Sequence, residues 1–383
     1  MKIGILTYHF SDNFGALLQA YALRRWLIER GHAAEFINYH PSYVEQGGSL
    51  LLPTSKERIK ANIKILYLYF ANIQRKLAGN PDQSLKFEEF RRDILGVNGP
   101  NYDSLEKLRS AALDHDVMIA GSDQIWNPSA QKGLDPAYFL AFGNSRVRRL
   151  SYAASFGKDT LAPEFHDEAR PLINRLDAIS IREQSGVEIV HQLTGRQIAC
   201  VPDPTLLHTQ YEELLDLSQD RQDRQDGHVF CYALRTADGI RQVADAAARK
   251  YQTHIISPYN IHRRWREIGT TVYPGPADWV RQIAHSRCVV TNSFHGTVFS
   301  IIFRKPFVVV GLRGGKAGLN ARAKNLLSSL GLMHRFLDAE NSSRAGEVLE
   351  QAIDWQSVEL HQNALRSAGE NFLLYALSEE QLT

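Results

Sequence analysis

Apolar and polar segments alternate along the chain in a pattern typical of an α/β protein. Lys2–Tyr8 has the uninterrupted apolar character of a strand buried in a parallel sheet. Ala16–Arg30 then carries apolar residues at helical spacing, and Gly31 suits the end of that helix. A second strand is predicted at Ala34–Tyr39. This strand–helix–strand start is Rossmann-like, but the first turn lacks the GxGxxG pattern, so NAD or FAD binding is not expected.

Four further predicted strands are each followed directly by a polar cluster. These strands are Asp116–Ala120, Leu150–Ala154, Ala178–Ile181 and Ile198–Val201. Their clusters begin at Gly121, Ser155, Arg182 and Pro202, and Asn13–Gly15 follows the first strand. In a parallel sheet the carboxyl ends of the strands share one edge, and ligands bind outside that edge. We therefore expect a binding site built from these five junctions.

A second α/β series occupies the other half of the chain. Strands are predicted at Val229–Leu234, His254–Ser257, Cys288–Thr291 and Pro306–Gly311, with helices near Gly239–Tyr251, from Pro276 and over Thr297–Phe303. The fold class expected is α/β, with two Rossmann-like domains of parallel sheet facing a cleft. The expected domains are 1–207, with a helical insertion at about 42–112, and 228–342. The polar segment 208–227 is expected to link them, and helices in 343–383 to cross back to the first domain.

Composition narrows the classes of protein. The chain has 383 residues, 44% of them hydrophobic and 22% charged, as expected for a globular protein with a sizeable core. A formal net charge of +2 is too small to indicate nucleic-acid binding. The three cysteines show neither disulfide nor metal spacing, which suits a reducing cytoplasm. No apolar stretch approaches the ~20 residues of a membrane span.

The segment Lys56–Lys76 leaves two interpretations open. It has a broad apolar face at helical spacing, and its charged residues are basic apart from Glu57. An ordinary packed helix with a solvated basic face fits this pattern. So does an interfacial helix that rests on anionic lipid, which would make the protein peripheral at the cytoplasmic face of a membrane.

The turn Asn292–Gly296 joins a predicted buried strand to a predicted buried helix. The N-terminus of such a helix presents unpaired N–H groups and binds anions readily. His295 in this turn could act as a cation, an acid or a hydrogen-bond donor. The alternative is a structural imidazole bonded to a nearby carbonyl.

Two charged residues in the first half have a functional and a structural interpretation each. Arg182 could clamp a phosphate or carboxylate, or it could simply pair with Glu183 or Asp203. Asp123 could be a general base or could accept a hydrogen bond from a sugar, or it could merely cap a helix or turn. Trp126 offers a flat face of the kind that sugars stack on, although most tryptophans belong to cores.

The glycine-rich basic segment Arg313–Gly318 is a candidate anion-binding loop, although it is not a Walker A loop. No cluster of Asp, Glu and His has metal-ligand spacing, and no Gly-x-Ser-x-Gly elbow is present.

Taken together, the polar clusters resemble the polysaccharide pyruvyl transferase family over most of the chain. The resemblance is carried by Asn13–Gly15, Leu18–Leu23, Gly121–Pro128, Tyr152–Gly157, Ile181–Ser185, Val201–Leu206, Thr291–Gly296 and the segment from Arg322 to Leu332. It implies a fold like that of the GT-B glycosyltransferases. It also implies transfer of pyruvate from phosphoenolpyruvate to two sugar hydroxyls, giving a cyclic ketal and phosphate.

The resemblance also suggests roles for particular residues. Family members commonly carry an Arg-Leu-His-like motif where this chain has Ser293-Phe-His295, so the histidine carries over and the arginine does not. Arg182 matches a family arginine. Cations considered as substitutes for the missing one are Lys305, Arg313, Lys316 and Arg322.

The resulting hypothesis assigns a donor side and an acceptor side. His295 acts on phosphoenolpyruvate as proton donor or phosphate partner, Arg182 binds the donor's anionic groups, and Asp123 is the acceptor-side base. The other donor-binding candidates are Asn292, Ser293, Phe294, Gly296, Thr297, Arg313, Lys316 and Arg322. The acceptor-binding candidates are Asn13, Gly15, Gln124, Trp126, Asn127 and Ser155.

The hypothesis includes no metal and no cofactor besides the donor substrate. The acceptor would be an exopolysaccharide or capsule precursor, lipid-linked if Lys56–Lys76 contacts the inner leaflet. Two alternatives remain: a nucleotide-sugar glycosyltransferase of the same fold, and a non-catalytic sugar- or anion-binding module.

Overall fold

The computed structural model describes residues 1–41, 43, 63, 80–131, 133–218, 227–237, 239–259 and 268–378, without the side chains of 315–317. The chain divides into two compact units. The first comprises Met1–Pro81, Glu88–His208 and Arg366–Thr383, and the second comprises Asp82–Phe87 and Thr209–Leu365.

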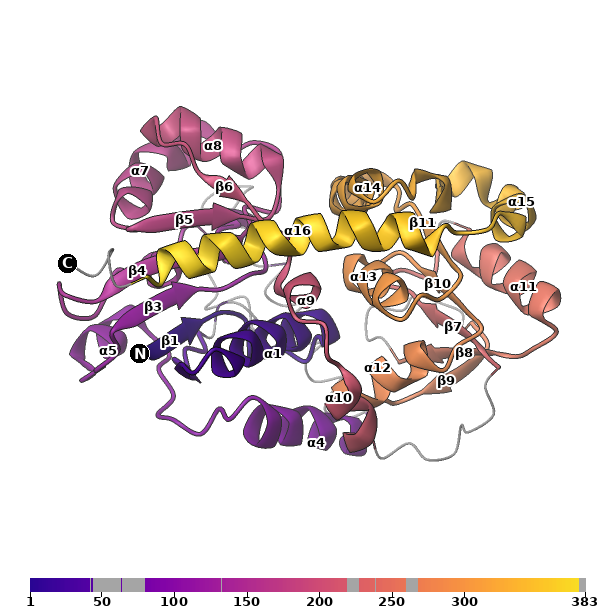
Figure 1. Ribbon diagram of the computed structural model, residues 1–383, viewed down its shortest axis with the longest axis horizontal. Helices are drawn as coiled ribbons and strands as arrows, with labels where there is room; N and C mark the ends of the chain where they lie inside the picture. The colour runs from indigo at the N-terminus through magenta and orange to yellow at the C-terminus, as the bar shows by residue number, and fades with distance from the viewer. Residues whose placement is uncertain are drawn as a thin grey trace. The chain divides into compact units, whose positions relative to one another are not determined.

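The first unit contains a six-stranded parallel sheet of order β2-β1-β3-β4-β5-β6 (Figure 1). Its strands are β1 (Lys2–Leu6), β2 (Ala33–Phe36), β3 (Val117–Ala120), β4 (Arg148–Ala154), β5 (Ala178–Ile181) and β6 (Ala199–Cys200). All residues of β3 and β4 are buried, because helices cover both faces of such a sheet. The two arginines at the start of β4 are buried as well, and Arg149 donates to the carbonyls of Leu140, Val147, Phe142 and Asn144.

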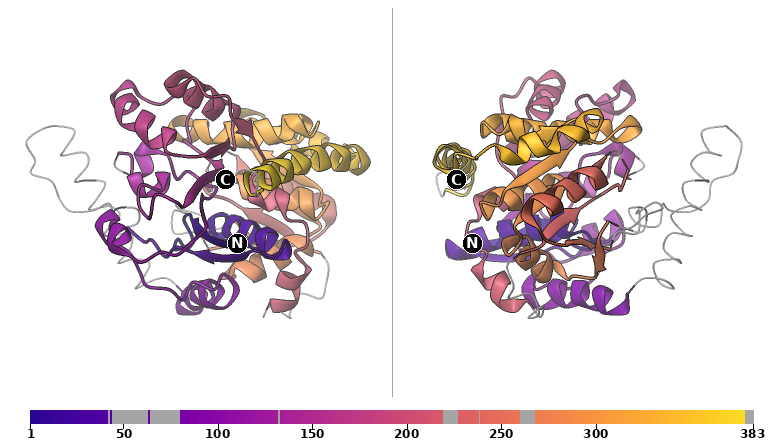
Figure 2. Two further views of the ribbon diagram at one scale, coloured as in Figure 1. Left: turned by 60° about the vertical axis from the view of Figure 1, so that its left-hand side comes forward. Right: turned by 90° about the vertical axis from the view of Figure 1, so that its right-hand side faces the viewer.

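Helices connect the strands of this unit. They are α1 (Phe14–Glu29), α5 (Leu105–Ser110), α6 (Pro128–Gln131), α7 (His166–Asn174), α8 (Gln184–Thr194) and α9 (Pro204–Leu207), with a π-helix at Phe90–Ile94 and 3₁₀ turns at Pro136–Phe139 and Pro163–Phe165. α1 packs against α9 and β2, and α7 packs against α8 (Figures 1 and 2). α1 is buried along most of its length, and its first ten residues are all buried.

The second unit contains another six-stranded parallel sheet, of order β12-β11-β10-β7-β8-β9. Its strands are β7 (Val229–Tyr232), β8 (Ile255–Pro258), β9 (Thr270–Val272), β10 (Cys288–Thr291), β11 (Phe307–Val310) and β12 (Phe336–Leu337). Its helices are α10 (Glu212–Leu217), α11 (Ile240–Tyr251), α12 (Pro276–Ala284), α13 (Phe294–Ile302), α14 (Asn320–Ser329) and α15 (Ala345–Glu350), with 3₁₀ turns at Gly314–Leu319, Met333–Arg335 and Ala339–Arg344.

Two helices contribute residues to both units. α4 (Pro81–Glu89) contributes Asp82–Phe87 to the second unit, where Lys86 pairs with Asp278 of α12 at 2.7 Å. α16 (Trp355–Ala376) contributes its residues from Arg366 onward to the first unit. There Glu370 pairs with Arg30, and Phe372 lies against Tyr152.

The predicted fold class is confirmed, with two α/β units that each hold a parallel sheet. The strands predicted at Ala178–Ile181 and Cys288–Thr291 have the bounds that the structure shows. The helix predicted over Thr297–Phe303 begins earlier, at Phe294, because Ser293 caps it. The strands β9 and β12, at the two edges of the second sheet, were not predicted, because three and two residues are too few to show a strand pattern in the sequence.

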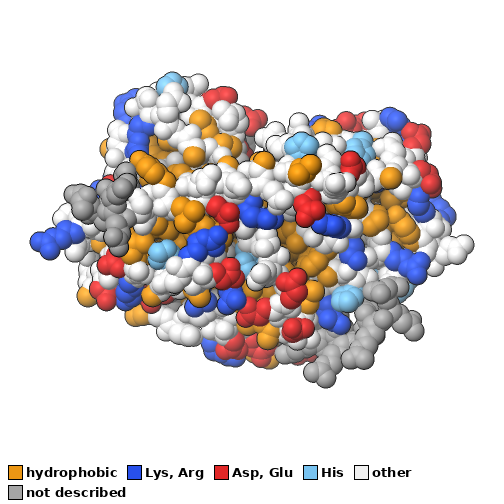
Figure 3. Space-filling view, in the orientation of Figure 1, with side chains coloured by type: hydrophobic (Ala, Val, Ile, Leu, Met, Phe, Trp, Pro, Cys, Tyr) orange, Lys and Arg blue, Asp and Glu red, His pale blue; other side chains and the backbone are white. Residues whose placement is uncertain are grey.

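The predicted basic helix Lys56–Lys76 lies outside the described residues, apart from Ile63. No helix in the described part of the chain is long and apolar enough to cross a membrane. Acidic and basic side chains are mixed together on the face drawn in Figure 3, in keeping with the small net charge.

Candidate functional site

Arg182 lies at the carboxyl end of β5 in the first unit, inside a buried ion-pair network. Its Nη1 donates to Asp203 Oδ2 at 2.8 Å, and its Nε donates to Glu183 Oε1 at 2.9 Å. The Arg182 side chain is 3% exposed and that of Asp203 is 0% exposed. Burial opposes the charge, but Glu183, Asp203 and Asp123 outweigh it and raise the pKa of Arg182 above its usual value. Arg182 thus makes the ion pairs that its structural interpretation expected.

The same network holds the backbone on either side of Asp123. The Ser122 carbonyl accepts a hydrogen bond from Thr7 Oγ1 at 2.8 Å, and Ser122 Oγ donates to Asp203 at 3.1 Å. Gln19 Nε2 donates in turn to Thr7 Oγ1 at 2.9 Å. Segments from four strand ends therefore fix the position of one short loop.

Asp123 adopts a left-handed backbone conformation, with φ of +82°. Aspartate tolerates this region better than most residues, because its short polar side chain can bond locally. Here Asp123 Oδ1 accepts from Gln124 N at 2.8 Å, and the residue bridges to Ala154 at the end of β4. The side chain is half-buried, and its Oδ2 has no hydrogen-bond partner among the residues that the structure describes. This oxygen is available to a ligand.

Three of the predicted acceptor-binding residues come together beside Asp123. Asn127 Nδ2 donates to Gln124 Oε1 at 2.7 Å, and the Gly157 amide donates to Ser155 Oγ at 3.0 Å. A Cβ at position 157 would lie 2.6 Å from Gln124 Oε1, and the backbone φ there is +66°, so a larger residue would displace the Gln124 amide and strain the backbone. The amides and the hydroxyl form a compact polar group next to the carboxylate.

The expectation that a sugar stacks on Trp126 is corrected by the position of this side chain in the core. Its side chain is fully buried, stacks on Phe139 at 4.8 Å and donates its indole N–H to the Tyr138 carbonyl at 2.9 Å. Asn13 and Gly15 lie at the start of α1, where Asn13 accepts a hydrogen bond from Ala16 N and Gly15 is buried. Asn13 thus acts as the helix cap, and its side-chain oxygen serves the backbone.

In the second unit, the start of α13 is built by short side chains. Ser293 is the N-cap and accepts from Gly296 N at 3.4 Å, while Thr297 Oγ1 donates to the Ser293 carbonyl at 2.9 Å. Thr291 Oγ1 accepts from Ser293 N at 3.0 Å, and a Cβ at position 296 would lie 2.4 Å from that oxygen. His295 is the second residue of the helix and is 8% exposed. The structure thus places His295 at a helix N-terminus, as predicted.

Asn292 ties the carboxyl end of β10 to that of β7. Its Oδ1 accepts from Leu234 N at 2.6 Å, and its Nδ2 donates to the Arg235 carbonyl at 2.8 Å. The predicted ligand residue Asn292 therefore serves the backbone through both ends of its amide. Its effect is to bring the loop after β7, including Arg235, beside the start of α13.

The cations considered near His295 differ in their surroundings. The Arg322 guanidinium carbon lies 5.8 Å from the centre of the Phe294 ring, and Phe294 packs edge-on against His295. Arg313 pairs with Glu340 at 3.0 Å. Lys305 precedes β11 and so lies at the opposite, amino edge of the sheet, which removes it from consideration. The Lys316 side chain is outside the described residues.

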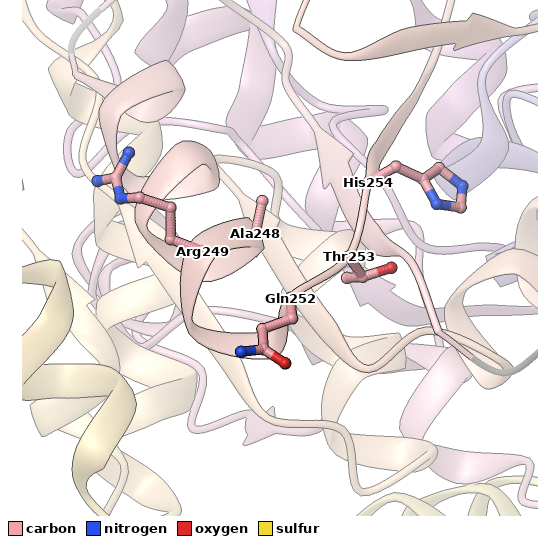
Figure 4. A pocket seen from close by; sticks show the side chains of 5 residues that line it. All are labelled: Ala248, Arg249, Gln252, Thr253 and His254. Atoms are coloured by element: carbon pink, nitrogen blue, oxygen red, sulfur yellow. The ribbon is translucent and has the colours of Figure 1, made fainter.

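An open surface depression of about 620 Å³ is lined by Ala248, Arg249, Gln252, Thr253 and His254. It lies at the end of α11 and the amino end of β8, whereas His295 follows the carboxyl end of β10. The labelled side chains point in different directions rather than toward one another (Figure 4). The depression is therefore separate from the candidate site. Within the described residues, no group of three or more His, Cys, Asp or Glu is arranged to hold a metal ion.

Comparison with known proteins identifies relatives of the sequence and of the fold. The model of the polysaccharide pyruvyl transferase family matches residues 13–313. None of the curated proteins compared with the chain matches it.

Among solved structures, a putative UDP-N-acetylglucosamine 2-epimerase from Listeria monocytogenes is similar with a TM-score of 0.52 and 11% identity, covering 100% of this chain and 97% of its own. The epimerase from Neisseria meningitidis bound to UDP-GlcNAc has a TM-score of 0.51 and 12% identity, covering 98% and 100%. At this identity the likeness concerns the fold alone.

Proposed function

Because the chain belongs to the polysaccharide pyruvyl transferase family, we propose that it transfers pyruvate from phosphoenolpyruvate to two hydroxyls of one sugar. The products would be a cyclic ketal and phosphate. The observation that carries this proposal is the contrast between two polar groups at carboxyl strand ends. One is an accessible carboxylate among amides, and the other is a histidine at a helix N-terminus with arginines nearby.

The group around Asp123 suits a neutral sugar better than an anion. Arg182 brings one positive charge, whereas Asp123, Glu183 and Asp203 bring three negative charges. This surplus of negative charge repels a phosphate. Carboxylate and amide groups, by contrast, are suitable partners for hydroxyls. We assign the acceptor to this unit, with Asp123 Oδ2 taking the proton from an attacking hydroxyl and Gln124 and Asn127 orienting the sugar.

The group around His295 suits the anionic donor. The N-terminus of α13 carries a partial positive charge, and its first N–H groups favour a phosphate or carboxylate. Arg322 lies against Phe294, one residue from the histidine. We therefore assign phosphoenolpyruvate to the second unit.

Each proton and bond in the proposed reaction has a place. His295 protonates the methylene carbon of phosphoenolpyruvate while the first hydroxyl, losing its proton to Asp123, bonds to C2. The C2–O bond to phosphate then breaks, the second hydroxyl attacks the resulting oxocarbenium ion, and its proton passes to the departing phosphate. Asp123 then loses the proton that it accepted and His295 regains one, both by exchange with water, so that both residues return to their starting states.

Arg182 has a different role from the one expected from the sequence. Arg182 forms ion pairs with two carboxylates inside the first unit. We propose that it holds the loop of Asp123 in position and that other cations bind the donor.

The proposal is tested by incubating the protein with phosphoenolpyruvate and a panel of lipid-linked and free sugar acceptors. Phosphate release together with a new ketal methyl signal in the NMR spectrum is expected. His295→Ala and Asp123→Asn should each lower the rate about 10²- to 10⁴-fold, the usual range for loss of general acid–base groups.

Two other results would overturn the proposal. Release of UDP from UDP-sugars, with phosphoenolpyruvate inert, would identify a nucleotide-sugar glycosyltransferase. Sugar or anion binding without turnover on any donor would identify a non-catalytic module.

A further inference from the structure

We propose that Arg235 is the guanidinium that binds the anionic donor beside His295, in place of the arginine that the family motif carries where this chain has Ser293. The inference rests on the proposed function, because it concerns the donor site of that reaction. Arg235 follows a predicted strand, but its neighbourhood depends on which strands are adjacent in the sheet.

The sheet brings Arg235 and His295 to the same edge. β7 pairs in parallel with β10, with Tyr232 opposite Thr291. Adjacent strands lie about 4.8 Å apart, so the residues that follow them at the carboxyl edge are neighbours. Arg235 follows Tyr232 by three positions and His295 follows Thr291 by four. An arginine on the loop that follows β7 can therefore reach a ligand bound at the N-terminus of α13.

Hydrogen bonds hold the backbone of this loop in place. Asn292 binds Leu234 N and the Arg235 carbonyl, at 2.6 and 2.8 Å, and Thr291 Oγ1 donates to the Tyr232 carbonyl at 2.8 Å. The Arg235 side chain thus starts from a fixed point that is tied to the residues immediately before α13. This is the kind of positioning that a preorganised ligand site requires.

The charge of Arg235 is left without a carboxylate partner. Its Nη1 donates to the Arg313 carbonyl at 3.3 Å, and no Asp or Glu among the described residues pairs with it. Arg313, in contrast, pairs with Glu340. A half-buried guanidinium without a counter-ion attracts a phosphate or carboxylate more strongly than one that is already paired. Of these two arginines, Arg235 is the one better suited to the donor.

The decisive comparison is between Arg235→Met and Arg287→Met in the full-length protein. Arg287 is exposed and immediately precedes β10, so it lies at the opposite, amino edge of the same sheet. We expect Arg235→Met to raise the KM for phosphoenolpyruvate about 10- to 100-fold, the loss of one or two charge-assisted hydrogen bonds. Arg287→Met should leave the KM unchanged. Unchanged thermal midpoints would show that both variants are folded.

A second pair of measurements separates this inference from the proposed function. Calorimetric titration with phosphoenolpyruvate, and with inorganic phosphate alone, reports binding without turnover. Arg235→Met should weaken both ligands, and Arg235→Lys should weaken them less because it keeps the charge. Asn292→Ala, which releases the loop, should weaken phosphoenolpyruvate in the same direction.

The outcomes distinguish the two ideas. Wild-type turnover of phosphoenolpyruvate with an unchanged KM in Arg235→Met would overturn the role of Arg235 and leave the proposed function standing. Wild-type binding of both ligands without turnover, weakened by Arg235→Met, would support the anion site and count against the transferase reaction. Failure of the wild-type protein to bind either ligand would reject both.

Discussion

Arg182 and Arg235 both follow the carboxyl ends of parallel strands, yet their surroundings indicate different roles. Arg182 is enclosed by Asp203 and Glu183, whereas Arg235 has no carboxylate partner in the described part of the chain. The sequence shows that both follow strands, but their partners come from elsewhere. Asp203 is 21 residues beyond Arg182, and Asn292 is 57 residues beyond Arg235. The ion pairs of Arg182 were predicted as one of two alternatives. The contacts of Arg235 could not be predicted, because they depend on which strands are adjacent in the sheet.

At this scale we predict that Arg182→Met destabilises the protein by about 3–5 kcal/mol. Removing one member of a buried ion pair leaves the other charge uncompensated in a site of low polarity. Arg304→Met is the matched control, because the Arg304–Glu359 pair is more than half exposed and such pairs contribute about 0–1 kcal/mol. Urea unfolding of the three proteins makes the comparison. Equal midpoints for the two variants would contradict the structural role of Arg182.

Among the secondary-structure elements, α13 shows what sequence patterns predict and what they miss. The apolar run Cys288–Thr291 was predicted as a strand with its observed bounds, because central strands are apolar throughout. The polar residues after it were predicted as a turn, yet Phe294–Gly296 already belong to the helix. Ser293 acts as a helix cap because its side chain accepts a hydrogen bond from Gly296 N. The sequence does not show whether this bond forms, so a turn was an equally good prediction.

Gly296→Ala tests the close contact at the start of α13. The new Cβ would lie 2.4 Å from Thr291 Oγ1, so the helix start must shift and His295 with it. We expect a lower thermal midpoint and a loss of transferase rate. Gly346→Ala in α15 is the control, since nothing lies within 4 Å of its Cβ, and alanine should stabilise that helix by up to about 1 kcal/mol. Identical behaviour of the two variants would argue against a steric requirement at position 296.

The ion pair between Lys86 of α4 and Asp278 of α12 should make the free energy of unfolding depend on pH. Burial alone would raise the pKa of Asp278, but hydrogen bonds from Lys86, Gly275 N and Ser218, and the Lys86 charge, lower it below the ordinary value. The ionised Asp278 carboxylate therefore contributes its full stabilisation above the unfolded-state pKa of about 3.9. This stabilisation is lost as the pH falls through the lower folded-state pKa. Asp278→Asn should reduce stability at pH 7 and flatten the decline in stability below about pH 4. Thermal unfolding across this range tests the prediction, and parallel curves for the two proteins would refute it.

The whole molecule consists of two units that the chain enters more than once. The α/β class and the two series of strands could be predicted because apolar strands and helical spacing recur through the sequence. Helices in 343–383 were expected to cross back to the first domain, but the position of that return, at Arg366, and the assignment of residues 82–87 to the second unit could not be predicted. These depend on contacts such as Lys86–Asp278 and Arg30–Glu370, which join residues 192 and 340 positions apart.

Substitutions of two neighbouring leucines of α16 would show how much that helix stabilises the first unit. Leu373 is fully buried, whereas Leu374 is 54% exposed. Leu373→Ala should cost about 2–5 kcal/mol, the usual range for a buried leucine, and Leu374→Ala should change stability by less than about 0.5 kcal/mol. Chemical denaturation gives both values. A negligible effect of Leu373→Ala would mean that the first unit does not depend on α16.

The return of α16 to the first unit has a consequence for the protein's synthesis. When the ribosome has made residue 208, the first unit still lacks the helix that pairs with Arg30 and lies against Tyr152. At about 5–20 residues per second, the nascent chain waits roughly 10–30 s before that helix is made. Throughout this interval the apolar side chains that α16 covers remain available to chaperones and to other nascent chains. The protein's yield in a cell should therefore depend on how well that surface is protected during translation.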